Sequence, residues 1–159
     1  MKSLILLRHA KSSWSEEGQD DYERPLNARG KRDAPSAGQI LAREGLPDFI
    51  VSSSARRANA TARRVIQASG YRADLLLTPR LYLAPPSAYF ALMQSLCWEP
   101  PSLLMVGHNP GIEELVRILT GKPVPMPTAA LVRLELPILA WKDASFDTQG
   151  SLQKYWTPE

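Results

Sequence analysis

The sequence predicts a three-layer α/β fold, in which helices lie on both faces of a mainly parallel sheet. Short apolar runs alternate with helix-like segments along the chain, which is typical of strands joined by helices in a parallel sheet. The runs at residues 4–7 and 103–106 are continuously apolar, as expected for strands buried on both faces. The length of 159 residues favours a single domain over residues 1–159.

Apolar composition and turn residues place the individual elements. Strands are expected at residues 3–8, 48–52, 74–77, 102–106 and 129–136, the first of them central. Helices are expected at residues 27–43, 55–69, 87–97 and 110–120. The expected helix N-caps are Asn27, Ser53 or Ser54, and Asn109 followed by Pro110. Residues 10–27 form a long polar loop, a type of segment that often carries function, and a tail with Trp141 and Trp156 closes the chain.

Composition and charge narrow the classes of function. The chain is 44% hydrophobic and 22% charged, as in ordinary globular proteins, with a formal net charge of +3. Basic residues cluster at positions 29–32, 56–57 and 63–64, but they form no stripe interleaved with aromatics. A nucleic-acid partner is therefore not expected, whereas an anionic substrate is.

The single cysteine excludes an intrachain disulfide, and we expect Cys97 to be a small core residue. Cys97 and two histidines offer too few ligands for a zinc site, so no metal and no cofactor are expected. The N-terminal apolar run ends at Arg8, too early for a signal peptide or a membrane span. We therefore expect a cytoplasmic protein without a membrane partner.

Each of the two histidines follows an apolar run. His9 and His108 should thus lie at the carboxyl ends of parallel strands, where open α/β sheets bind ligands. Arg8 precedes His9, and an arginine guanidinium binds phosphate in a bidentate manner. A neutral imidazole beside it can attack phosphorus and hold the phosphoryl group covalently. Taken alone, this pair is better explained by a histidine hydrogen-bonded at a strand end.

A third strand–helix junction favours a phosphate site over a purely structural role for these residues. Arg56 and Arg57 fall in the first turn of a predicted helix, whose free amides already favour anions. His108 should lie at another helix start, where it can donate a hydrogen bond to a phosphoryl oxygen. Three such junctions together predict a phosphoryl-transfer site that stabilises charge without a metal.

Five segments, in order from residue 4 to about 130, resemble the histidine phosphatase superfamily, which has the phosphoglycerate mutase-like fold. These are residues 7–10 (LRHA, with Ala10 where the family signature has glycine), 21–30 (DYERPLNARG), 53–61 (SSARRANAT), 106–110 (VGHNP) and 126–130 (MPTAA). The chain is most similar to the small bacterial SixA-type phosphohistidine phosphatases. Each segment alone is modest evidence, but the ordered set is specific.

The resemblance implies roles for particular residues. His9 would be phosphorylated and then hydrolysed, while Arg8, Arg57 and His108 would hold the phosphoryl group. On this match Arg57, not Arg56, is the arginine of the phosphate pocket. Further substrate-binding candidates are Ser15, Arg56 and Asn109.

The proton donor is the feature that is missing. Larger relatives carry a glutamate or aspartate for the leaving group, but residues 81–86 (LYLAPP) hold no carboxylate. Asp20 and Asp21 in the long loop are the remaining candidates. Phosphohistidine needs less acid assistance than a phosphate ester, because imidazole is a good leaving group.

The sequence therefore favours a phosphatase acting on phosphohistidine in a protein partner, such as a histidine-phosphotransfer domain, with phosphate as product. Two alternatives remain open. One is a small-molecule phosphomonoesterase or mutase-like enzyme. The other is a non-catalytic domain that binds phosphoproteins.

Overall fold

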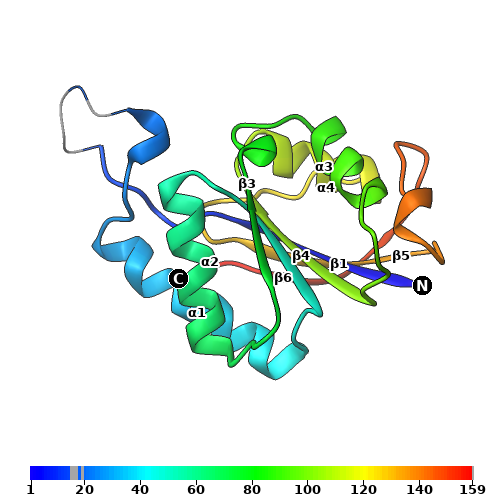
Figure 1. Cartoon of the computed structure of the whole chain (residues 1–159), viewed down its shortest axis with the longest axis horizontal. Helices are drawn as coiled ribbons and strands as arrows, with labels where there is room; N and C mark the ends of the chain where they lie inside the picture. The colour runs from blue at the N-terminus through cyan, green and yellow to red at the C-terminus, as the bar shows by residue number, and fades with distance from the viewer. Residues whose placement is uncertain (15–17, 19, 159) are drawn as a thin grey trace.

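The computed structural model describes residues 1–14, 18 and 20–158, and it contains a six-stranded sheet with helices on both faces. The strand order is β3-β2-β4-β1-β5-β6. Figure 1 shows α1 and α2 on one face of the sheet and α3 and α4 on the other. The predicted three-layer α/β architecture is thus confirmed.

The strands are β1 (Lys2–Arg8), β2 (Phe49–Ser53), β3 (Leu75–Thr78), β4 (Ser102–Gly107), β5 (Leu131–Leu136) and β6 (Ser151–Trp156). The helices are α1 (Ala28–Glu44), α2 (Arg56–Ser69), α3 (Pro86–Gln94) and α4 (Gly111–Thr120). Three short 3₁₀ helices are η1 (Asp21–Glu23), η2 (Pro79–Leu81) and η3 (Trp141–Asp143). No helix in the described part of the chain has the length and apolarity needed to cross a membrane.

Strands β3, β2, β4 and β1 are parallel, whereas β5 runs antiparallel to β1 and β6 antiparallel to β5. Strand β6 was not predicted from the sequence, where its residues belong to the tail that carries Trp141 and Trp156. The reason is that β6 is an edge strand with mostly exposed side chains. Its pairing with β5 defines it, and no apolar run marks it in the sequence.

Central strand β1 is buried on both faces. Leu4 and Leu6 pack into the core beneath α3 and α4, whereas Ile5 and Leu7 pack beneath α1 and α2. This is the two-residue alternation of an extended strand. All four side chains are fully buried, so β1 and the residues at its end are held firmly.

Two expectations about single residues were wrong, for Cys97 and for the cap of α2, and the packing of Trp141 was left open by the sequence. Cys97 is exposed, because α3 ends at Gln94 and Cys97 follows the helix. Trp141 in the tail is fully buried, and its indole N–H donates to the Pro100 carbonyl oxygen at 2.7 Å. Helix α2 begins without a side-chain cap.

The caps of the other two helices follow the expectation more closely. Asn27 caps α1, accepting from the Gly30 N–H at 2.9 Å. Helix α4 starts at Gly111, and Asn109 accepts from the Glu113 N–H at 3.2 Å.

Candidate active site

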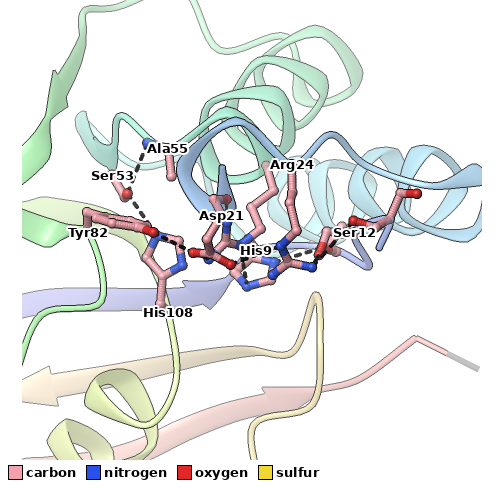
Figure 2. Close-up of polar contacts among 11 residues, drawn as sticks. His9, Ser12, Asp21, Arg24, Ser53, Ala55, Tyr82 and His108 are labelled. Carbon is pink, nitrogen blue, oxygen red and sulfur yellow. Dashed lines mark hydrogen bonds and ion pairs between the residues drawn. The ribbon is translucent and has the colours of Figure 1, made fainter. Parts of the chain in front are cut away.

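Three strand–helix junctions meet at one edge of the sheet. In the register of the parallel strands, Arg8 at the end of β1 lies opposite Gly107 at the end of β4. His9 and His108, one residue further on, are therefore neighbours, and their ring centroids are 5.1 Å apart. Strand β2 pairs with the other side of β4, which brings Ser53 and the start of α2 to the same place (Figure 2).

His9 is held as a neutral imidazole with one nitrogen free for chemistry. Its Nδ1 lies 2.8 Å from the Ala10 carbonyl oxygen, which only accepts, so Nδ1 carries the proton. Nε2 then has the lone pair, and the Arg57 Nε–H donates toward it at 3.4 Å. Burial lowers the pKa of His9 to about 3, opposed in part by the Ala10 hydrogen bond, and the nearby His108 lowers it further. The ring is therefore uncharged at neutral pH.

His108 has a similar protonation state but a different partner. Burial lowers the pKa of His108 to about 3, and the charge of Arg57 lowers it further. Its Nε2 lies 2.8 Å from the hydroxyl oxygen of Ser53, while its Nδ1 is buried without a hydrogen-bond partner among the described residues. In Figure 2 this second nitrogen faces the side on which His9 lies. An orphaned buried nitrogen beside His9 is suited to a phosphoryl oxygen.

The Ser53 hydroxyl hydrogen-bonds to His108 Nε2 and can act as the donor in this contact. Its oxygen accepts from the Ala55 N–H at 3.2 Å, and its one proton is then available for His108 Nε2. In this arrangement the His108 proton resides on Nδ1, the nitrogen that faces His9. The sequence analysis proposed Ser53 only as a helix cap and missed this contact.

Arg57 is buried, with 2% exposure, and lies between His9 and Asp21. It donates to the Asp21 carbonyl oxygen at 2.6 Å and to Asp21 Oδ2 at 3.0 Å. Tyr82 also donates to this carboxylate. Although partial burial raises it, the hydrogen bonds from Tyr82 and Arg57 lower the pKa of Asp21 to about 2. Asp21 therefore orients Arg57 as a carboxylate, and in this arrangement it holds no proton to donate.

Arg24 is a site residue that the sequence analysis did not select. It is 6% exposed, and it donates to Asp21 Oδ1 at 3.0 Å and to the Ser12 hydroxyl at 2.8 Å. Its guanidinium carbon also lies 3.4 Å from the centroid of the Trp14 ring. The signal was present in the family-like segment at residues 21–30, but no strand or helix pattern singled out Arg24.

Of the other predicted site residues, two line the cleft beside His9 and one is exposed. Arg8 and Asn109 line the cleft, and both donate to the Met126 carbonyl oxygen, at 3.2 and 2.8 Å. Arg56 is exposed, and its guanidinium reaches the Glu23 carbonyl at 3.5 Å.

Two further candidates lie in the long loop. Asp20 is exposed and precedes η1. Ser15 lies outside the described residues.

Together these side chains line a cleft of about 290 Å³. The lining residues are Arg8, His9, Lys11, Ser12, Trp14, Asp21, Arg24, Arg57, Leu83, His108, Asn109 and Thr128. The cleft combines a neutral imidazole with several cations, which suits an anion of the size of a phosphoryl group. Its volume is near the lower end for small-molecule sites, so it has little room for a large metabolite.

Comparison with known proteins agrees with this geometry. The model of the histidine phosphatase superfamily, branch 1, matches residues 4–82. An uncharacterized chloroplastic protein of Arabidopsis thaliana is 32% identical over 153 residues, covering 90% of this chain and 70% of that protein.

Two solved structures share the fold. A crystal structure assigned to the phosphohistidine phosphatase SixA of Agrobacterium tumefaciens is 28% identical, covers 99% of this chain and 98% of its own, and has a TM-score of 0.84. The protein histidine phosphatase SixA complexed with tungstate is 20% identical, covers 96% and 95% of the two chains, and has a TM-score of 0.80. The chain belongs to branch 1 of the histidine phosphatase superfamily, with a backbone of the SixA type.

Proposed function

We propose that this phosphatase removes the phosphoryl group from phosphohistidine in a protein, through a covalent intermediate on His9. The observation that carries the proposal is the state of His9. Its Nδ1–H is bound to the Ala10 carbonyl, and its Nε2 lone pair faces Arg57 in the cleft. A nucleophile must be deprotonated, and the lowered pKa of His9 satisfies this condition at neutral pH.

In the first step, His9 Nε2 attacks phosphorus, the Nε2–P bond forms and the P–N bond of the substrate breaks. The leaving nitrogen keeps the electron pair of the broken bond. The far nitrogen of the substrate ring carries a proton taken from solvent, so a neutral imidazole departs. Because this ring protonates near pH ~6.5, no acid is required at the leaving nitrogen. This chemistry is consistent with an ionised Asp21 and a carboxylate-free stretch at residues 81–86.

In the second step, a water oxygen attacks phosphorus, and the Nε2–P bond breaks with its electron pair returning to His9. The protons of the water leave with inorganic phosphate or pass to solvent. The Nδ1–H of His9 stays on the Ala10 carbonyl in both steps, where it stabilises the positive charge of the phosphorylated ring.

Arg8, Arg57 and His108 supply the electrostatic stabilisation. The two guanidinium groups carry positive charge beside the nucleophile, and His108 Nδ1–H is free to donate to an equatorial oxygen. Preorganised donors of this kind lower the barrier of phosphoryl transfer without a metal. We therefore propose a metal-independent reaction, for which exhaustive chelation is expected to leave turnover unchanged.

A comparison of substrates tests the proposal. A phosphorylated histidine-phosphotransfer domain should be hydrolysed with at least about tenfold higher kcat/KM than sugar phosphates or phosphoserine, and His9→Ala should abolish the activity. A higher kcat/KM for the small phosphate esters would favour the phosphomonoesterase alternative. Binding of the phosphorylated domain without turnover would favour the non-catalytic alternative.

A further inference from the structure

An exposed tryptophan lines the same cleft as His9. Trp14 is 75% exposed, although large aromatic side chains gain most when they are buried. The fold therefore gains little from an indole at this position. Because Trp14 lies on the wall of the cleft, its ring is available for contact with a ligand, as aromatic side chains commonly are in ligand sites.

The indole rests on a support that is itself fixed. Arg24 lies under the ring, with 3.4 Å from its guanidinium carbon to the ring centroid, and Arg24 is buried and bonded to Asp21 and Ser12. The chain on either side of the support is joined by a bridge between Ser12 and Leu26. The ring is therefore held in place before any ligand arrives.

The charge of this support is offset in part by an acidic partner. The Arg24 guanidinium forms an ion pair with the Asp21 carboxylate at 3.0 Å, and the same carboxylate also pairs with Arg57. Because Trp14 is mostly exposed, a large part of its π surface remains open to a ligand in the cleft. Such a surface attracts flat and cationic groups.

We propose that Trp14 binds the imidazole ring of the substrate phosphohistidine and so selects aromatic over aliphatic N-phosphoryl leaving groups. This inference rests on the proposed function. The reactive form of the leaving ring is planar and carries a positive charge, because its far nitrogen is protonated. Contact with the indole face stabilises this form relative to the neutral ring, and it orients the P–N bond toward His9.

A second exposed apolar side chain in the cleft supports this role. Leu83 is 53% exposed and lines the cleft together with Trp14. It lies in the stretch at residues 81–86, which holds no carboxylate. The leaving group is thus offered apolar and aromatic surface in place of an acid.

Two substrates with the same type of bond test the inference. Free phosphohistidine and phospholysine both contain a P–N bond, but only phosphohistidine has an aromatic leaving group. Trp14→Leu should lower kcat/KM for phosphohistidine by about fivefold and that for phospholysine by a clearly smaller factor, because phospholysine has no flat ring to stack on the indole. Trp14→Phe should restore part of the loss.

The pH dependence of kcat/KM gives a second test. For phosphohistidine, the alkaline limb of this profile should move to lower pH in Trp14→Leu, because the cationic ring loses its stabilising contact.

Trp98→Leu is the matched control, since Trp98 is an exposed tryptophan that packs on Phe49 outside the cleft. This variant should leave kcat/KM unchanged for both phosphohistidine and phospholysine. Equal losses on both substrates in Trp14→Leu, or no loss on either, would overturn the inference while the proposed function stands. If the wild-type protein hydrolyses neither free phosphohistidine nor a phosphorylated histidine-phosphotransfer domain, the proposed function itself is refuted and the inference with it.

Discussion

At the scale of single residues, the site depends on two histidines that stay neutral. Both are buried, with 6% exposure for His9 and 1% for His108, and both lie near Arg57. Burial disfavours the charged form of an imidazole, and a neighbouring cation disfavours it again. The proposed nucleophile and the proposed hydrogen-bond donor are thus both neutral near pH 7.

The protonation of these two rings is directly measurable, because they are the only histidines in the chain. An NMR titration should show neither ring with a midpoint near 6.5, since burial lowers the pKa of each to about 3. Both rings should remain neutral down to about pH 4 while the protein is folded. A midpoint between pH 6 and 7 for His9 would contradict this description of the nucleophile.

The contact between Ser53 and His108 is expected to govern rate and not stability alone. Ser53→Ala removes the hydroxyl that hydrogen-bonds to His108 Nε2, so the ring loses the contact that positions it and supports the Nδ1–H tautomer. We expect kcat to fall about tenfold, with a smaller change in KM. Ser53→Thr, which keeps the hydroxyl, should restore part of the rate.

The neighbouring Ser52 offers a matched control for this experiment. It is fully buried on the same strand, and its hydroxyl donates to the Ser53 carbonyl and not to His108. Ser52→Ala should therefore keep kcat near the wild-type value. An equal loss of kcat in both alanine variants would assign the effect to the packing of β2.

At the scale of elements, helix α1 approaches α2 closely at Gly38. A Cβ on Gly38 would lie 2.7 Å from the Val65 carbonyl oxygen and 2.9 Å from the Ala68 Cβ. Since α2 carries Arg57 in its first turn, this contact also sets where the arginine lies relative to His9.

Gly38→Ala should therefore lower the free energy of unfolding by about 1–3 kcal/mol, because the two helices must move apart. Intrinsic helix propensity alone predicts the opposite sign, a gain of up to about 1 kcal/mol. Chemical denaturation decides between the two. Gln39→Ala, at an exposed position of the same helix, should change the stability by less than about 0.5 kcal/mol. A stabilised Gly38→Ala variant would refute the close packing.

The sequence predicted the parallel strands because their apolar runs are continuous, and it predicted His9 and His108 at one edge because both follow such runs. Arg24 and Trp14 could not be placed in this way. They belong to the segment at residues 10–27, whose described parts are held by the Ser12–Leu26 bridge and by ion pairs with Asp21. Pairing between distant segments determines such a path, and no local pattern encodes it.

At the scale of the whole molecule, burying neutral histidines makes folding sensitive to acid. In the unfolded chain each histidine binds a proton below pH ~6.5, whereas in the native state each binds one only near pH 3. Between these values the unfolded state holds more protons, so stability falls as the pH falls. Asp21 adds to this loss only below pH ~4, since its pKa is lowered to about 2.

The free energy of unfolding should consequently fall from pH 6 to pH 4.5, with each histidine contributing up to about 1.4 kcal/mol per pH unit. His9→Asn and His108→Asn should each flatten this dependence, whatever their effect on stability at pH 7. Denaturant titrations at several pH values measure the slope. Identical slopes in the wild type and both variants would show that the histidines do not account for acid sensitivity.

The central claim is that the phosphoryl group passes through His9 Nε2. The most direct measurement is to mix the protein with a phosphorylated histidine-phosphotransfer domain, quench in alkali, and locate the phosphoryl group by mass spectrometry and ³¹P NMR. We predict phosphorylation at Nε2 of His9, because Nδ1 is bound to the Ala10 carbonyl, and no label in His9→Ala. A phosphoryl group on His108 or on Nδ1 of His9, or full turnover by His9→Ala, would contradict the account.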